Sequence, residues 1–317
     1  MTASAPAAVV HVAAAAIFDS QGRVLIARRP AHVDQGDLWE FPGGKLEPGE
    51  SVEEALCREL WEEIHIRPTA YRPLIRVPYQ YPGKRVLLDV WRVDAFTGTP
   101  HGREGQPVRW VGLDELTGYS FPAANRPIVA AVRLPERYLI TGDFQSSDDF
   151  LSRLERALRR GIRLVQLRVK GERGADLAPL QAAVDLAHRF GATVLLNGDA
   201  AHAQRLGADG VHLSASQLDA LAARPVPEDR WCGASCHSEE ELRRAAAIGV
   251  DYVLLSPVLP TQSHPGAPSL GWQRFAELAA QQPFPVYALG GLSDADLSRA
   301  FSCRAQGVAA IGAYWGR

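Results

Sequence analysis

Short apolar segments alternate with amphipathic helical segments throughout the second half of the chain, and this alternation constrains the fold more than any other feature. Helical segments such as 148–160, 176–190 and 238–248 lie between the short runs. Eight strand–helix units in about 180 residues predict a compact (β/α)8 barrel, with any site at the carboxyl ends of the strands. The eight candidate strands are Tyr138–Thr141, Leu164–Arg168, Thr193–Asn197, Gly210–Leu213, Trp231–Ser235, Tyr252–Ser256, Val286–Leu289 and Val308–Ile311.

The alternation begins only after Arg133–Glu136, so we place a domain boundary there. A chain of 317 residues is too long for one small domain, and each half is long enough to bury its own core. We therefore predict one domain over residues 1–133 and a second over residues 137–317. The sequence carries no signal for an oligomeric state.

The composition argues against several partners and compartments. A net charge of −2 gives no sign of a surface for polymeric nucleic acid. The alanine-rich start lacks the basic region of a signal peptide, and no apolar run is long enough to span a membrane. The four cysteines show no disulfide or zinc spacing, which favours reduced thiols in a cytoplasmic protein.

The first half is organised around Gly43–Ile66, where two glycines lead into a helix rich in carboxylates. Ser51 is expected to cap a helix that runs from Val52 to Ile64. Apolar residues at four-residue spacing predict a buried stripe along it. Three glutamates align beside that stripe, because residues three and four apart share a helix face. They are Glu59, Glu62 and Glu63.

Like charges at this spacing repel, so something has to offset them. One explanation for neighbouring glutamates on a helix is that they form a solvated acidic face neutralised by Arg58. The other is a divalent cation, Mg²⁺ or Mn²⁺, because hard oxygen ligands suit both ions, and magnesium sites usually recruit substrate phosphates.

The whole stretch resembles the box of the Nudix hydrolase family. Its one departure from that pattern is His65, where the family has a glycine that does not bind metal. The resemblance implies an α/β/α sandwich with a mixed sheet, and a strand hairpin before the box formed here by Val9–Phe18 and Arg23–Arg28. The matching positions are Gly44, Glu50, Arg58, Glu59, Leu60, Glu62, Glu63 and Ile66.

Within this family the chain is most similar to the MutT type, through LWEFPGGK, REGQP, Trp110 and FPAANRPIV. That resemblance implies that Glu104 adds a carboxylate to the metal cluster and that Asn125 reads a purine. An amide suits this role, because it can pair with a carbonyl beside an N–H. Arg29 matches a position near the substrate, and Phe41 is either an apolar wall for the base or a core residue.

The expected activity is therefore metal-dependent pyrophosphohydrolysis of a nucleoside triphosphate. Oxidised purine nucleotides are the expected substrates, with 8-oxo-dGTP converted to 8-oxo-dGMP and pyrophosphate. Glu59, Glu62, Glu63 and Glu104 are the expected metal ligands and the candidate bases, with the Gly44 carbonyl as a further ligand. Arg58 is expected to orient a glutamate through a bidentate pair.

The second half resembles thiamine phosphate synthase and its relative TenI, through YLIT, VQLRVK, LGADGVHL, SPVLPTQSHPGAPSLGW and ALGGL. A thiazole or thiamine-type phosphate is the ligand that this resemblance implies, bound where backbone N–H groups face an anion. The candidate ligand-binding residues are Gln166, Arg168, Lys170, Asn197, Gly290 and Gly291.

Three departures set this barrel apart from both relatives. Gly198 and Gln217 stand where the synthase has magnesium-binding aspartates, and Asp199 is one position away. Pro257 stands where TenI has a histidine. Neither activity carries over, so the barrel is expected to be a degenerate domain. Two alternatives stay open: the first domain hydrolyses a thiamine-related diphosphate, or the barrel is a non-catalytic sensor.

Overall fold

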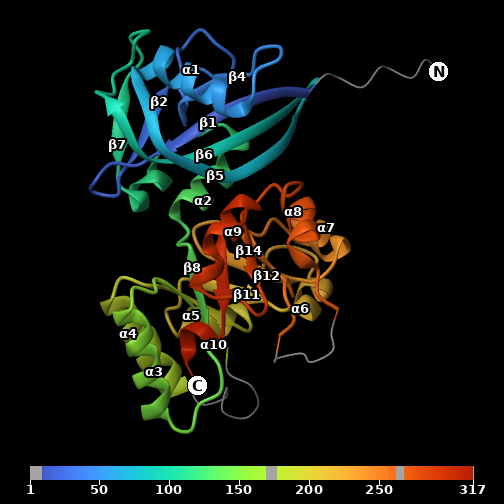
Figure 1. The fold of residues 1–317 in the computed structure, drawn as a ribbon. Coiled ribbons are helices and arrows are strands. Elements are labelled where there is room, and N and C mark those ends of the chain that lie inside the picture. The colour runs from blue at the N-terminus through green and yellow to red at the C-terminus, as the bar shows by residue number, and fades with distance from the viewer. Residues whose placement is uncertain (1–8, 169–176, 262–267, 317) are drawn as a thin grey trace, which may run out of the picture. The chain divides into compact units, whose positions relative to one another are not determined.

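The computed structural model describes residues 9–168, 177–261 and 268–316 (Figure 1). The chain divides into two compact units, one of residues 1–133 with 280–283 and one of residues 134–279 with 284–317. The first unit holds two small sheets and the second holds a closed barrel. Each unit has its own hydrophobic core.

The larger sheet of the first unit has the order β4-β1-β6-β5. Strand β1 pairs parallel with β6 and antiparallel with β4, which confirms the predicted mixed sheet. The smaller sheet has the order β3-β2-β7. The strands are β1 (Val9–Ile17), β2 (Val24–Arg28), β3 (Trp39–Glu40), β4 (Gly43–Lys45), β5 (Ile66–Tyr81), β6 (Lys84–Gly98) and β7 (Val108–Val111).

Residues 13–17 of β1 are buried on both faces, because helices cover the sheet on two sides (Figure 1). Ala13, Ala15 and Ile17 pack with residues of α1 (Val52–Ile64). Ala14 and Ala16 point the other way and pack with residues of α2 (Arg126–Arg133), which follows the 3₁₀ helices η1 (Leu113–Gly118) and η2 (Ala123–Asn125). This alternation confirms the α/β/α sandwich.

The predicted strand, turn and second strand before the box form, but the two strands do not pair beyond the turn. Strands β1 and β2 share a single bridge, between Phe18 and Val24, and then enter different sheets. Strand β1 takes β6 and β4 as neighbours, and β2 takes β3 and β7. The physical reason is that each strand is completed by partners far away in the chain, which outnumber the single local bridge.

Helix α1 begins and ends where the sequence predicts. Ser51 accepts from the backbone N–H of Glu54, whose side chain in turn accepts from the Ser51 N–H, and this capping box satisfies free donors of the first turn. His65 ends the helix in the left-handed conformation, with φ 60°. Glycine is the residue that adopts this conformation without strain, so the departure from the family pattern is a strained helix end.

The second unit is a barrel of eight parallel strands, as predicted, in the order β10-β11-β12-β13-β14-β15-β8-β9. Its strands are β8 (Arg137–Ile140), β9 (Leu164–Leu167), β10 (Thr193–Asn197), β11 (Gly210–Leu213), β12 (Trp231–Cys236), β13 (Tyr252–Leu255), β14 (Val286–Leu289) and β15 (Gly307–Ala310). Its helices include α3 (Ser147–Arg159), α4 (Leu177–Arg189), α5 (Ala200–Arg205), α6 (Ala215–Ala220), α7 (Glu239–Ile248), α8 (Gly271–Ala279), η4 (Asp294–Asp296), α9 (Leu297–Ser302) and α10 (Gly312–Trp315).

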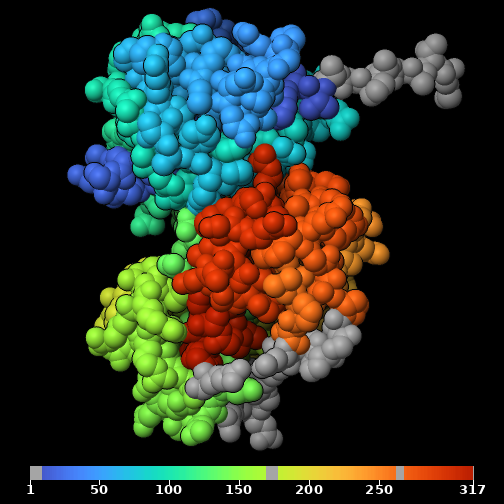
Figure 2. Space-filling model, viewed as in Figure 1, coloured from blue at the N-terminus to red at the C-terminus, as the bar shows by residue number. Residues whose placement is uncertain are grey.

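Side chains fill the barrel interior. Tyr138, Tyr252 and Tyr287 are fully buried there, and the hydroxyls of Tyr138 and Tyr252 lie 2.8 Å apart. Outside the barrel, the last described residues lie beside α3 on the molecular surface (Figure 2), where Arg153 Nη1 donates to the carbonyl of Gly316 (3.3 Å). Within the described ranges, no helix has both the length and the apolar character that a membrane span requires.

Candidate functional site

The guanidinium of Arg58 links the carboxylates of the box. It forms a bidentate pair with Glu50, through Nε (2.9 Å) and Nη2 (2.8 Å). Its Nη1 donates to Glu59 (2.8 Å) and to Glu62 (3.3 Å). Its Nη2 also reaches the carbonyl of Lys45 (3.0 Å), which ties the helix to the loop before it. Arg58 therefore holds carboxylates that would otherwise repel one another.

Two carboxylates lie against the glycine backbone of the β4 region. Glu63 Oε2 accepts from the N–H of Gly43 (2.8 Å). The Glu59 carboxylate fills the space beside Gly44, where an added Cβ would lie 2.2 Å from its Cδ. Helix α1 and strand β4 thus bring together two glutamates and two glycines from separate parts of the chain.

Glu63 is half-buried, and the pKa of its carboxyl is raised to about 8. Desolvation is the largest cause, the negative charges of Glu40 and Glu59 add to it, and the hydrogen bond from Gly43 opposes them. A nearby cation would relieve this repulsion.

The donor set fits a hard divalent cation. Every candidate ligand is an oxygen, and Gly44 has no Cβ to fill the cradle that the Glu59 carboxylate occupies. Among the residues that the structure describes, no group of three or more acidic, histidine or cysteine side chains is arranged to hold a metal ion. The oxygens of Glu59 and Glu62 instead accept from Arg58.

Glu104 lies exposed in the loop that joins β6 to β7. That loop docks on the carboxyl end of α1, where the N–H of Arg103 donates to the carbonyl of Glu63 (3.0 Å). The structure thereby brings the Glu104 loop to the helix that carries the other predicted ligands.

Arg29 pairs with Glu40, and two of its nitrogens also reach the carbonyl of Asp34 (2.8 and 3.3 Å). Burial raises the pKa of Glu40 above its ordinary value, and the charge of Arg29 lowers it. Our sequence analysis missed Glu40. The available signal was a carboxylate between two aromatic residues, three positions before Gly43.

The segment before α2 lies beside β3. The N–H of Trp39 donates to the carbonyl of Ser120 (2.9 Å), and Phe41 stacks on Phe121 with ring centroids 5.6 Å apart. Phe41 is 3% exposed, so it belongs to the core, one of the two alternatives that the sequence left open. Asn125 ends η2 and is 9% exposed, and its side chain has no hydrogen bond to another residue in the described part of the chain.

In the barrel, the predicted polar residues form a buried network. Gln166 donates to the hydroxyl of Tyr138 (3.1 Å) and accepts from Asn197 Nδ2 (3.1 Å). Arg168, at the end of β9, is half-buried and donates its N–H to Thr141 Oγ1 (2.8 Å). Lys170 lies outside the described residues.

Gly290 and Gly291 have positive φ angles and pack against the segment after β13. A Cβ at Gly290 would lie 2.9 Å from Pro257 Cα, and one at Gly291 would lie 2.6 Å from the carbonyl oxygen of Pro260. Close packing of the two loops is therefore enough to explain why both positions are glycine.

Asp199 and Gln217, which lie beside and at the positions discussed for a metal in the barrel, both take part in helix caps. Asp199 accepts from the N–H of His202 (2.9 Å) and caps α5. Gln217 accepts from the N–H and the hydroxyl of Ser214 (both 3.0 Å) at the start of α6.

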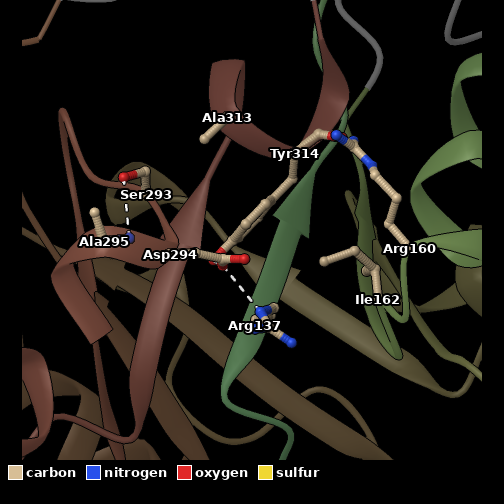
Figure 3. A pocket seen from close by; sticks show the side chains of 8 residues that line it. All are labelled: Arg137, Arg160, Ile162, Ser293, Asp294, Ala295, Ala313 and Tyr314. Atoms are coloured by element: carbon tan, nitrogen blue, oxygen red, sulfur yellow. Dashed lines mark hydrogen bonds and ion pairs between the residues drawn. The ribbon is translucent and has the colours of Figure 1, made fainter. Parts of the chain in front are cut away.

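A hollow of about 220 Å³ on the barrel unit contains none of the predicted site residues (Figure 3). Its polar groups already bind one another: Asp294 accepts from Arg137 Nε (2.9 Å) and from the hydroxyl of Tyr314 (2.8 Å). Arg160 is bound to the carbonyl of Tyr314 (2.6 Å). The hollow therefore gives no reason to move the site there.

Each unit matches the model of a different protein family. Residues 13–131 match the family model described as NUDIX domain, and residues 137–314 match the one described as thiamine monophosphate synthase.

Curated relatives match one unit at a time. An 8-oxo-dGTP diphosphatase of Escherichia coli is 36% identical over 124 residues, which are 39% of this chain and 96% of that protein. A CTP pyrophosphohydrolase of the same organism is 39% identical over 117 residues, 37% of this chain and 87% of that protein. A putative thiamine-phosphate synthase 2 of Aquifex aeolicus is 34% identical over 181 residues, 57% of this chain and 97% of that protein.

Proposed function

Because the chain belongs to the Nudix family through residues 13–131 and to the thiamine monophosphate synthase family through residues 137–314, we propose that it hydrolyses nucleoside triphosphates with a divalent metal ion. Oxidised purine nucleotides are the proposed substrates, with 8-oxo-dGTP giving 8-oxo-dGMP and pyrophosphate. Such an activity would remove mutagenic nucleotides from the precursor pool. The observation that carries the proposal is the pair of carboxylates, Glu59 and Glu63, held against Gly43 and Gly44.

The proposed ligands are the carboxylates of Glu59, Glu62, Glu63 and Glu104 with the Gly44 carbonyl. Bound Mg²⁺ or Mn²⁺ would supply charge neutralisation at the phosphates and a more acidic water. Arg58 keeps the box carboxylates in register through its pair with Glu50. One of the glutamates acts as the base and takes a proton from the attacking water as that water adds to phosphorus and pyrophosphate leaves.

Asn125 is the proposed reader of the base. The Asn125 side chain has no hydrogen-bond partner among the described residues, and its amide atoms are not fully enclosed, so both ends of the amide are open to a ligand. A base edge that presents a carbonyl beside an N–H would satisfy both ends of the amide. The likeness to an 8-oxo-dGTP diphosphatase supports this choice.

Two other substrate classes compete with it. The likeness to a CTP pyrophosphohydrolase favours a pyrimidine triphosphate, and the attached barrel favours a thiamine-related diphosphate. Initial rates with Mg²⁺ on 8-oxo-dGTP, dGTP, CTP and thiamine diphosphate decide among them. Higher kcat/KM for CTP or thiamine diphosphate than for 8-oxo-dGTP would refute our substrate.

Asn125→Ala tests the base reader separately. Loss of a hydrogen bond to the base should lower kcat/KM for 8-oxo-dGTP by about 10-fold to 100-fold. An equal loss on every nucleotide would show that Asn125 does not read the base.

For the barrel we propose a binding role for a phosphorylated ligand, without metal-dependent synthesis. Asp199 and Gln217 are used as helix caps, while the network around Gln166 and Asn197 remains. Calorimetric titration of the full chain with thiazole phosphate, and with inorganic phosphate, tests this role. The absence of both heat and a thermal shift would remove it.

A further inference from the structure

The loop between β6 and β7 caps the carboxyl end of α1. The last carbonyl groups of any helix lack partners within it. Here the carbonyl of Glu63 accepts from the N–H of Arg103 (3.0 Å), and that of Ile64 accepts from the N–H of His101 (3.2 Å). Arg103 Nη1 also donates to the carbonyl of Trp61 (3.2 Å). The helix that carries the box is therefore completed by residues from about 40 positions later in the chain.

Gln106 strengthens this junction with its side chain. Its Nε2 donates to the carbonyl of Glu63 (3.1 Å), and its Oε1 accepts from the N–H of Glu104 (2.9 Å). One half-buried amide thus ties the main chain of Glu104 to the main chain of Glu63.

The loop is shaped to hold this amide. The N–H of Gly105 donates to the carbonyl of Gly102 (3.3 Å), and Gly105 has φ 81°. A Cβ at Gly102 would lie 1.9 Å from the carbonyl oxygen of Gln106 and 2.8 Å from its Oε1. Any side chain at Gly102 would displace Gln106.

We propose that Gln106 is a positioning residue that holds Glu104 in register with Glu63 for binding a divalent ion. The inference rests on the function proposed for residues 13–131. A carboxylate on an unrestrained loop would lose conformational entropy on binding, and a fixed loop avoids most of that loss. Glutamine suits the place because its amide supplies one donor and one acceptor, whereas glutamate would offer no donor and would add negative charge.

The test is a double-mutant cycle on the full chain, with Mn²⁺ affinity in the absence of nucleotide as the readout. Gln106→Ala should weaken Mn²⁺ binding by about 10-fold or more, as for other groups that orient metal ligands. In a Glu104→Gln background the same change should alter the affinity less than about twofold. Hydrogen exchange at the Glu104 amide should accelerate in Gln106→Ala.

An unchanged affinity in Gln106→Ala would overturn the inference, and so would an equal loss in both backgrounds. If Gln106→Ala fails to fold, Gln106→Glu takes its place in the cycle, because it keeps the volume and the acceptor but not the donor. Gln80→Ala is the matched control: Gln80 also donates to a main-chain carbonyl, that of Tyr81 (2.8 Å), and this variant should bind Mn²⁺ as the wild type does.

Turnover separates this inference from the proposed function. A wild-type chain that binds Mn²⁺ but hydrolyses no nucleoside triphosphate would refute the function and leave the cycle interpretable. If the wild-type chain hydrolyses nucleotides but Gln106→Ala does not change the Mn²⁺ affinity, only the role of Gln106 is refuted.

Discussion

The carboxylate of Glu59 occupies the place where any residue other than glycine at position 44 would put its Cβ. Gly44 lies on β4 and Glu59 on α1, so a strand and a helix meet here without a side chain between them. The neighbouring glycine is needed for a different reason. A Cβ at Gly43 would lie 2.1 Å from the carbonyl oxygen of Ala13, which is main chain and cannot move aside.

This difference predicts opposite results for two adjacent substitutions. Gly44→Ala should leave the free energy of unfolding within about 1 kcal/mol of the wild type, because the end of a flexible Glu59 side chain can swing away. Its nucleotide turnover should fall by about 100-fold, because a ligand is displaced. Gly43→Ala should instead destabilise the fold by more than about 2 kcal/mol.

Urea unfolding measures the stability of the two variants, and initial rates on 8-oxo-dGTP measure their turnover. A Gly44→Ala protein that is both stable and fully active would show that Glu59 does not bind metal. Equal stability of the two variants would contradict the packing argument.

Glu62→Gln and Glu63→Gln test the box directly. Each removes a charged ligand, so kcat should fall by about 100-fold or more while the thermal unfolding temperature changes little. Glu53→Gln, at an exposed position in the first turn of the same helix, is the matched control and should keep its turnover. Full activity in Glu63→Gln would refute the assignment.

The left-handed end of α1 predicts an unusual order of stabilities at His65. Glycine there would relieve about 1 kcal/mol of backbone strain but would lose the ring contact with Trp61, whose centroid lies 4.1 Å away. Alanine would lose the contact and keep the strain. We expect His65→Ala to be less stable than His65→Gly by about 1 kcal/mol in urea unfolding, and the reverse order would show that the strain is negligible.

His212 predicts how barrel stability depends on pH. Burial, together with the nearby charge of Arg168, lowers its pKa to about 3. The folded barrel therefore keeps the ring neutral, bound to Ser235 Oγ (2.9 Å), while the unfolded chain takes up a proton below its ordinary pKa of 6.5. Stability from this group is present above pH 6.5 and should fall by about 1 kcal/mol per pH unit on acidification toward pH 3.

The effect is measured as the free energy of unfolding in urea between pH 7 and pH 4.5, for the wild type and for His212→Gln. The variant should have a shallower pH dependence, because glutamine at position 212 does not titrate. Parallel pH profiles would show that His212 does not contribute.

The elements of both units and the closed barrel could be predicted from the sequence, whereas the strand partners of β1 and β2 in the first unit could not. Helix α1 begins and ends where its cap and its apolar spacing place it, and the eight barrel strands follow short apolar runs. The pairing of β1 and β2 was predicted wrongly, because adjacency in the chain favours a hairpin while the long-range partners β6 and β7 decide the sheet.

The sequence by itself determined which residues share one face of α1, because a helix repeats every 3.6 residues and the spacing of Glu59, Glu62 and Glu63 is local. Only the tertiary structure decided what those carboxylates meet: Gly43 and Gly44 from β4, and Gln106 beside the main chain of Glu63. Such contacts join segments 15 to 43 residues apart. They depend on sheet register and on the docking of a loop, and no periodicity along the chain encodes either.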